Sequence, residues 1–251
     1  MRYREPAICI RTHDFSETSQ IVHFFTRGQG LVRLIAKGTK RPKSKSGGMI
    51  DLLAEGDLVY SASGRDTLGT LMEFSETAVH TPLRRDVTRL HAALYLIELV
   101  GETLAESDVH PEVFDLLHHS LARLGQSGSP VTAVLAYFQW RLLQHVGLLG
   151  DLSLCSDCGQ PLTPADAANR GGVYFSSQQG GLLCGSCEGA VAQKTRVDAD
   201  TLAAIGVMYA VTAGQKLPMP EPQAAALNRL LAYHITHQLG KRLRMMRHVV
   251  E

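Results

Sequence analysis

Two pairs of cysteines constrain this chain more than any other feature. The first pair forms a Cys-x-x-Cys turn at Cys155 and Cys158, and the second forms another at Cys184 and Cys187, with 25 residues between the turns. Each turn places two thiolates on one side of a metal ion, so two turns together complete a tetrahedron of sulfur ligands. Four protein ligands leave no position for water or substrate. The spacing therefore predicts one structural Zn²⁺ site rather than a catalytic one.

Two other interpretations of the four cysteines stay open at this point. They could form two disulfides, or they could be unrelated buried thiols. Disulfides need an oxidising compartment, and the N-terminal residues Met1–Pro6 show no apolar secretory segment. The fifth cysteine, Cys9, lies in an alternating apolar run, where we expect a small buried side chain without a chemical function.

The distribution of charge along the chain is more informative than the net charge. A hydrophobic content of 45% is ordinary for a protein with a real core, and no window of 18 apolar residues predicts a membrane span. The formal net charge is +1, but residues 1–50 hold ten Lys or Arg against three acids, and residues 51–80 hold one against six. This asymmetry predicts a polyanion-binding face in the N-terminal part.

The N-terminal third has the pattern of a small barrel. Alternating apolar residues and turn signals predict strands over 6–12, 20–27, 31–37, 49–53, 58–62 and 68–74. Short strands at this density are typical of an antiparallel barrel, and the OB-fold matches the size, although an SH3-like barrel would leave similar traces. In the third strand Val32, Leu34 and Ala36 are expected to face inward, which leaves Arg33 and Lys37 on an open face.

A basic stretch bounded by glycines, residues 38–48, follows the third strand and is expected to be a loop. Cations here could bind phosphates by releasing counterions, which gives salt-dependent affinity without sequence specificity. Aromatic side chains nearby (Tyr3, His13 and Phe15) could stack on the bases of a single strand. A solvated loop whose lysines serve solubility alone is the alternative. The predicted DNA-binding residues are Arg11, Arg33, Lys37, Lys40, Arg41, Lys43 and Lys45.

Beyond Thr81-Pro82 the apolar spacing becomes helical. We expect an α+β protein, with an OB-fold domain over residues 1–80 and a helical domain over 81–251 that carries the zinc module at about 151–190. Inside the module, residues 172–176 and 180–183 are expected to form a β-hairpin. A last helix is expected over about 221–249. The cations near its end, which could favour the helix dipole or face DNA, are Lys241, Arg242, Arg244 and Arg247.

Catalytic motifs are hard to find. His110-Pro111-Glu112 ahead of the first cysteine pair imitates the pattern of zinc deaminases, but Leu154 stands where that pattern has proline, and the second cysteine pair competes for the metal. No Walker loop, Gly-x-Ser-x-Gly elbow or His-Glu-x-x-His motif is present in the sequence. We therefore expect a binding protein rather than an enzyme.

Taken in order, several segments resemble the bacterial recombination mediator family RecO, over nearly the whole chain. They are Ala7–Arg11, Phe15–Val22, Phe25–Gly30, Ile35–Gly38, Tyr95–Leu99, Phe138–Leu143, and Gly147 ahead of Cys155-x-x-Cys158-Gly159. The resemblance implies an N-terminal OB-fold, a helical domain and an inserted zinc module, without enzymatic activity. Some members lack the cysteines, so the metal would support the architecture.

The resemblance also implies partners. RecO-like proteins bind single- and double-stranded DNA, anneal complementary strands, and act with RecR to help RecA replace single-strand-binding protein (SSB). Carried onto this chain, the DNA face would include Lys37, Lys40 and Arg41. The acidic tail of SSB would bind the helical domain, where an apolar pocket beside an arginine is needed. Candidates for that pocket are Tyr95, Leu96 and Arg141.

These expectations describe a cytoplasmic, nucleoid-associated protein with no membrane partner and no small-molecule substrate. An RNA- or ribosome-associated zinc-ribbon protein is the competing hypothesis. It predicts a preference for RNA through contacts with the 2′-hydroxyl groups.

Overall fold

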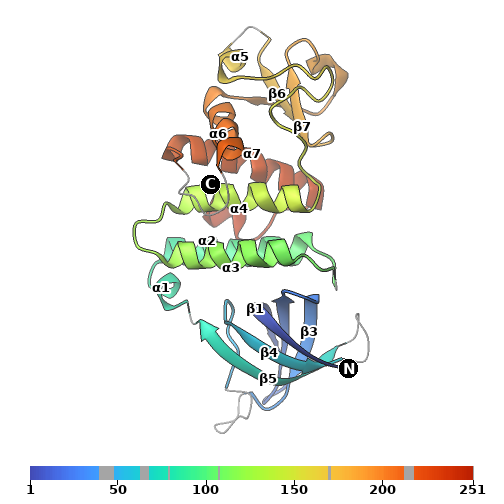
Figure 1. Ribbon diagram of the computed structural model, residues 1–251, viewed down its shortest axis with the longest axis vertical. Helices are drawn as coiled ribbons and strands as arrows, with labels where there is room; N and C mark the ends of the chain where they lie inside the picture. Colours follow the sequence, from blue (N-terminus) through green and yellow to red (C-terminus); the bar gives the residue numbers. More distant parts are fainter. Residues whose placement is uncertain are drawn as a thin grey trace. The chain divides into compact units, whose positions relative to one another are not determined.

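The structure is a computed structural model that describes residues 1–39, 48–62, 68–78, 80–106, 108–168, 171–211 and 218–250. The chain divides into two compact units, Met1–Ser127 and Gly128–Glu251 (Figure 1). The predicted domain boundary near residue 80 lies inside the first unit, just after its last strand, and stays a prediction. Within the described ranges, no helix is both long and apolar enough to cross a membrane.

The first unit begins with a closed five-stranded barrel. Its strands are β1 (Arg2–Asp14), β2 (Gln20–Thr26), β3 (Gly30–Ala36), β4 (Glu55–Ser61) and β5 (Gly69–Ala78). They follow one another around the barrel in the order β1-β2-β3-β5-β4, and within this barrel β3 and β5 pair in parallel. A small closed barrel of five strands confirms the predicted OB-type fold.

The barrel core follows the alternation in the sequence. Leu34 and Ala36 of β3 are buried with Phe24 of β2, while Arg33 and Lys37 are exposed. The opposite faces of these strands are only partly open, because Phe25 is fully buried and its ring lies 5.7 Å from the ring of Phe114. The outer face of the barrel is therefore divided between helix packing and a solvent-exposed region.

The expected strand over 49–53 is wrong. Ile50 and Leu53 are buried as their apolar character suggests, but the segment is a turn in which Leu53 adopts a left-handed φ of 69°. Its backbone is satisfied by other partners: the Leu53 N–H donates to the carbonyl of Cys9 at 2.9 Å, and the side chain of Gln20 bonds both polar groups of the Ile50 backbone. Apolar residues here close the barrel without joining its sheet.

Three helices complete the first unit: α1 (Thr81–Arg84), α2 (Val87–Thr103) and α3 (Pro111–Gly125). Asp86 caps α2 because its carboxylate accepts hydrogen bonds from the backbone N–H groups of Thr88 and Arg89. Pro111 begins α3, as the sequence predicts, since the first helical position needs no N–H donor.

A buried carboxylate ties these helices to the barrel. Glu55 of β4 accepts a hydrogen bond from His80 at 3.0 Å and forms another with His118 of α3. Burial acts to raise the pKa of Glu55, but the two histidine hydrogen bonds outweigh burial and lower the pKa below its ordinary value. The ionised form is therefore the one that the fold stabilises.

Replacing Glu55 by glutamine is expected to reduce the free energy of unfolding at pH 7 by about 1–3 kcal/mol, because charge-assisted hydrogen bonds are lost. A lowered folded-state pKa stabilises the fold above the ordinary value of 4.5, and this contribution disappears as the pH falls through the folded-state pKa. Urea unfolding at pH 7 and pH 4 should show the difference between the two proteins narrowing at acid pH. The matched variant Glu73→Gln, at an exposed position of β5, should change little. Equal stability of Glu55→Gln and the unmodified chain at pH 7 would contradict this role.

The second unit combines a helical part with a small cysteine module. Its elements are α4 (Val131–His145), α5 (Pro164–Ala168), β6 (Val173–Ser176), β7 (Gly181–Cys184), the short 3₁₀ helix η1 (Glu188–Ala190), β8 (Thr195–Val197), α6 (Ala199–Ala210), α7 (Glu221–Leu239) and the 3₁₀ helix η2 (Met246–His248). Gln139 of α4 donates to Asn228 of α7 at 2.6 Å, so a buried polar pair joins these two helices. The predicted hairpin is confirmed as β6 and β7, and β8 pairs with the other edge of β6.

The last helix is shorter than predicted. It ends at Leu239, because Gly240 adopts a left-handed φ of 63° and reverses the chain. Leu243 and Met246 are buried as expected, but they lie in an irregular segment and in η2. The four cations between Lys241 and Arg247 are exposed and lie beyond the end of α7, so their predicted placement on that helix is wrong, while the choice between a dipole role and a DNA-facing role stays a prediction.

Candidate metal centre and nucleic-acid interface

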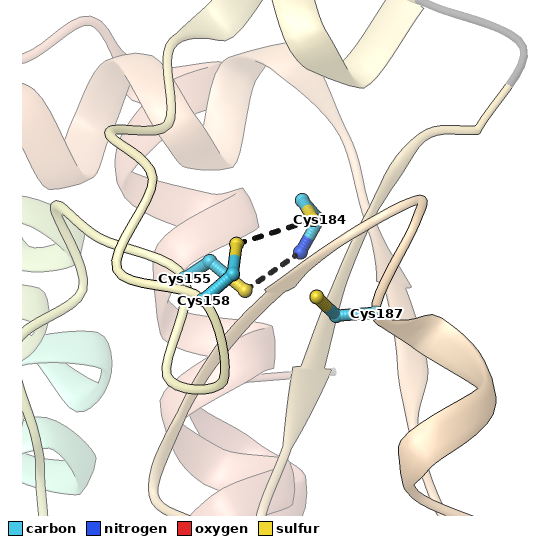
Figure 2. A group of neighbouring side chains, drawn as sticks. All are labelled: Cys155, Cys158, Cys184 and Cys187. Atoms are coloured by element: carbon cyan, nitrogen blue, oxygen red, sulfur yellow. Dashed lines mark hydrogen bonds between the residues drawn. The ribbon is translucent and has the colours of Figure 1, made fainter.

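Four cysteine side chains from two loops converge in the second unit. The ligand atoms of Cys155, Cys158, Cys184 and Cys187 all lie within 4.8 Å of one another. Figure 2 shows one pair on the loop that precedes the hairpin and the other pair at the end of β7, with the sulfur atoms directed toward one another. Residues 29 positions apart in the chain are thus brought to one point, as the spacing predicts.

Backbone hydrogen bonds build both turns. In the first, the Gly159 N–H donates to the carbonyl of Cys155 at 2.9 Å, and Gly159 takes the left-handed φ of 71° that such a turn requires. In the second, the Cys187 N–H donates to the carbonyl of Cys184 at 3.0 Å. The loops are joined by the Ser156 N–H, which donates to the carbonyl of Leu182 at 2.7 Å. Local turn geometry therefore sets the position of each sulfur pair.

The donor set fits a tetrahedral metal ion. Metal–sulfur bonds of about 2.3 Å place the sulfurs of a tetrahedron about 3.8 Å apart, and the sulfurs of Cys158 and Cys184 are separated by 3.8 Å. That distance is too long for a disulfide, and all five cysteines are free. His110, the residue that a deaminase would need, bonds to Asp108 instead and is not among the four ligands. The cluster could therefore hold a metal ion through sulfur alone.

The environment of Cys155 favours a thiolate. Burial acts to raise its pKa, but backbone N–H donors from Cys158, Cys184 and Asp157 outweigh burial and lower the pKa to about 6. The N–H of Cys184 lies 3.4 Å from the sulfur of Cys155 (Figure 2). The pKa of Cys187 is raised by hydrogen bonds with Asp157 and with neighbouring sulfurs. Closely spaced sulfurs thus retain protons unless a cation balances their charge.

Few apolar side chains pack around the four cysteines. The small cluster there consists of Leu183 and Val191 with two of the cysteines, flanked by partly buried Leu162 and Tyr174, while other apolar residues of the module, such as Phe175, are buried outside this cluster. A core of this size stabilises a fold weakly, and a metal commonly compensates in such modules. The module also contacts α7, because Gln238 donates to the carbonyl of Ser177 at 2.7 Å.

The predicted DNA-binding residues are only partly described. Arg11 of β1, Arg33 of β3 and Lys37 just after β3 are exposed on the barrel. The other four positions, Lys40, Arg41, Lys43 and Lys45, lie outside the described residues. Strand pairing brings Arg11 and Arg33 into one row, since each is opposite His23 of β2. The two arginines therefore flank a histidine on the outer face.

Both arginines lie on the face that we expected to be open, but they already form ion pairs with carboxylates of the same chain. Arg11 forms an ion pair with Glu102 of α2 at 3.0 Å, and Arg33 forms one with Glu106 at 2.9 Å. No local pattern in the sequence predicts these pairs, because the first joins residues 91 positions apart. Among the residues that the structure describes, no carboxylate forms an ion pair with Lys37.

His23 is a candidate contact residue that the sequence interpretation missed. Its ring lies edge-on to His13 with ring centres 5.6 Å apart. Burial, followed by the charges of Arg11, His13 and Arg33, lowers the pKa of His23 to about 4, so the ring is neutral at physiological pH. Alternation along the second strand, which places His23 on the face opposite Phe24, is the signal that could have identified it. Of the predicted stacking residues, Phe15 is 57% exposed, whereas Tyr3 stacks on Tyr60.

Two of the three residues suggested for the SSB tail are buried. Tyr95 and Leu96 are fully buried within the first unit. Arg141 belongs to the second unit, where its guanidinium donates to the carbonyl of Val211 at 3.1 Å and lies 5.3 Å from the ring centre of Tyr137. Binding of an acidic tail at these residues stays a prediction, and the buried pair offers it no accessible atoms.

Comparison with known families agrees with this architecture. The model "Recombination protein O N terminal" matches residues 1–78, which include all five barrel strands. The model "Recombination protein O C terminal" matches residues 84–247, which include α2 to α7 and the four cysteines. Together the two models cover nearly the whole chain.

Individual relatives lead to the same family. A DNA repair protein RecO of Anaeromyxobacter dehalogenans strain 2CP-C is 30% identical over 100% of this chain and 96% of its own length. The protein of the same name from Desulforamulus reducens is 27% identical over 96% of this chain and 91% of its own length. That of Synechococcus elongatus is 34% identical over 72% of this chain and 68% of its own length. With its OB-type barrel and its two matched domains, the chain belongs to the RecO family of DNA repair proteins.

Proposed function

We propose that this protein is a non-enzymatic recombination mediator that binds single- and double-stranded DNA and anneals complementary single strands. The observation that carries the proposal is an OB-type barrel with Arg11, Arg33 and Lys37 on its outside, in a chain that matches the RecO family along its length. The stretch that follows β3 in the sequence adds four more cations: Lys40, Arg41, Lys43 and Lys45.

The proposed mechanism is charge neutralisation. Two single strands repel each other through their phosphates, and a basic surface that replaces their counterions reduces this repulsion. Strands held in this way stay close for long enough that a few base pairs can form, after which pairing proceeds without the protein. Because phosphates carry no sequence information, annealing should depend on complementarity alone.

We propose zinc as the metal of the four-cysteine cluster. Cys155, Cys158, Cys184 and Cys187 would hold it, and the ion would balance the thiolate charges and link the two turns. Zinc is favoured because a tetrahedral set of four sulfurs is its usual structural site. The metal would have no part in DNA chemistry, so its role would be to keep the module folded.

The proposed partners are RecR and the SSB tail, and the proposed outcome is the loading of RecA onto SSB-coated DNA at the nucleoid. Family membership supports these partners, and the exposed cations of the barrel are compatible with binding to DNA that another protein already covers. The SSB tail is acidic, so its binding should weaken with salt as DNA binding does.

Strand annealing with SSB-coated DNA, with and without RecR, tests the proposal. The protein should accelerate annealing of complementary SSB-coated oligonucleotides by about tenfold or more at low salt, as expected for electrostatic steering. RecA loading on the same DNA should require both this protein and RecR. An RNA competitor of the same sequence should compete no better than DNA. Preference for RNA would favour the zinc-ribbon hypothesis, and a lack of annealing in dilute buffer would reject the mediator function.

A further inference from the structure

Two of the three described cations assigned to the DNA face are bound by the chain's own acids. Glu102 lies at the end of α2, and Glu106 lies in the segment that joins α2 to α3. Their carboxylates reach Arg11 and Arg33 at 3.0 Å and 2.9 Å, which are the distances at which a phosphate oxygen would bind. We propose that Glu102 and Glu106 act as intramolecular competitors of the DNA backbone, and that DNA must displace them to reach the two arginines. This inference rests on the proposed function of the barrel.

The two ion pairs belong to one site. Arg11 and Arg33 lie in the same cross-strand row on either side of His23, so a single strand crossing β1, β2 and β3 would meet both guanidinium groups. The acids come from one short stretch of the chain and reach the two ends of this row. With both pairs formed, the four charges cancel, and the row carries no net positive charge because His23 is neutral at physiological pH.

The backbone around Glu106 is docked against the barrel. Glu106 forms an isolated parallel bridge with Leu31, near the start of β3. Next to it, Gly30 has a left-handed φ of 68°, and a Cβ atom at this position would lie 2.2 Å from the carbonyl oxygen of Asp108. Glycine is thus required for the backbone of Asp108 to approach the start of β3 so closely. The position of the Glu106 carboxylate is therefore set by a backbone that is docked on β3.

The pairs are nevertheless weak enough to be displaced. The side chains of Arg33 and Glu106 are both 42% exposed, and that of Arg11 is 50% exposed. Exposed pairs contribute little to stability and are screened by salt. A polyanion with several phosphates can replace two such pairs, whereas an isolated anion cannot. The acids would therefore lower the affinity for DNA and make release easier, while favouring ligands long enough to contact Lys37 as well.

The test compares the double variant Glu102→Gln plus Glu106→Gln with the unmodified chain. Glutamine keeps the size of each side chain and removes its charge. Binding of a fluorescent 30-nucleotide oligo(dT) would be measured by anisotropy at several salt concentrations. We expect about 2- to 30-fold tighter binding from removal of two exposed ion pairs, together with a steeper salt dependence.

A matched control separates local competition from overall charge. The variant Glu112→Gln plus Asp115→Asn changes the net charge by the same amount and breaks a third pair between the barrel and a helix, Arg27–Asp115 at 2.9 Å, which lies outside the row. It should bind oligo(dT) with little change. The gain should also vanish when Glu102→Gln plus Glu106→Gln is placed in a chain that carries Arg11→Gln and Arg33→Gln.

Each result has a definite consequence. An unchanged affinity of the acid variant, an equal gain in the control, or a gain that survives without the two arginines would overturn the competition. A lower unfolding temperature of the acid variant without tighter binding would assign the pairs to structure alone. Failure of the unmodified chain and all variants to bind DNA would reject the proposed function, and the competition with it. If the double variant does not fold, Glu106→Gln alone is expected to bind about 1.5- to 5-fold tighter than the unmodified chain.

Discussion

Replacing Cys155 by serine is expected to abolish metal binding and to destabilise the second unit by more than about 4 kcal/mol. Cys155 is buried and has the lowered pKa that favours a thiolate ligand. Serine does not supply a thiolate, so only three of the four sulfur ligands would remain and the site would bind an ion far more weakly. Because the free energy of metal binding contributes to folding, losing the proposed ion should remove a large part of the stability of a module whose cysteines have so few apolar neighbours.

The destabilisation should extend from the module to α7. Phe175 of β6 is fully buried, with its ring 5.1 Å from that of His234 of α7, and Gln238 bonds the backbone just after β6. His234 also bonds the carbonyl of Leu148 at 2.7 Å, in the segment that leads from α4 toward the first cysteine pair. A disordered module would leave these groups without partners, so helical signal should be lost together with the metal.

Metal content and thermal unfolding followed by circular dichroism check this result. The unmodified chain should contain one zinc per molecule, and treatment with a strong chelator should reproduce the unfolding profile of Cys155→Ser. The same substitution at Cys9, the cysteine in the barrel core, should leave one zinc per molecule even if it lowers the stability of the barrel. Purified chain without metal, or identical unfolding profiles for the chain and Cys155→Ser, would contradict a structural ion.

The cysteine site could be predicted from the sequence because its geometry is local. Each Cys-x-x-Cys turn fixes two sulfurs through bonds within five residues, such as the one between Gly159 and Cys155. The hydrogen bond from the Ser156 N–H to the carbonyl of Leu182 in β7 then joins the first turn to the second. The barrel could be predicted for a related reason, since alternation in β3 reports directly which side chains face the core.

The sequence predicts which residues are buried more reliably than it predicts the helix or strand in which they lie. Ile50, Leu53, Leu243 and Met246 are all buried, as their apolar character indicates, but none lies in the strand or helix predicted for it. In the first case a left-handed residue, Leu53, ends any extended run. In the second, Gly240 ends α7, although the apolar spacing continues past it. Local breaks in the backbone therefore override periodicity.

Long-range electrostatic partners could not be predicted. A count of charges identifies a basic N-terminal segment, but it does not reveal that Glu102 and Glu106 lie against Arg11 and Arg33. Nor does it place Glu55 between His80 and His118, which come from distant parts of the first unit. Such contacts depend on how helices dock on the barrel, and no repeat or spacing in the sequence records that docking.

Neutralising Lys37, Lys40 and Arg41 with glutamine is expected to weaken single-stranded DNA binding by about 10²- to 10³-fold at about 50 mM salt. Each phosphate contact contributes about 0.7 to the slope of log affinity against log salt for single strands, which amounts to about 0.9 log unit at this salt concentration. Three lost contacts should therefore also lower the slope by about 2. Lys37 is exposed, and the other two cations follow it in the sequence.

The loss should be the same for every DNA sequence tested, because phosphate contacts do not read bases. A control with the same change in net charge, Arg85→Gln, Arg123→Gln and Arg229→Gln, removes cations outside the predicted face and should lower the affinity only slightly. Anisotropy titrations of both triple variants between about 50 and 300 mM salt give the affinity and the slope together. Equal losses in the two variants would mean that net charge alone attracts DNA. Unchanged affinity of the first variant at low salt would show that the strand-and-loop cations do not contact phosphates, and the DNA face would have to lie elsewhere on the protein.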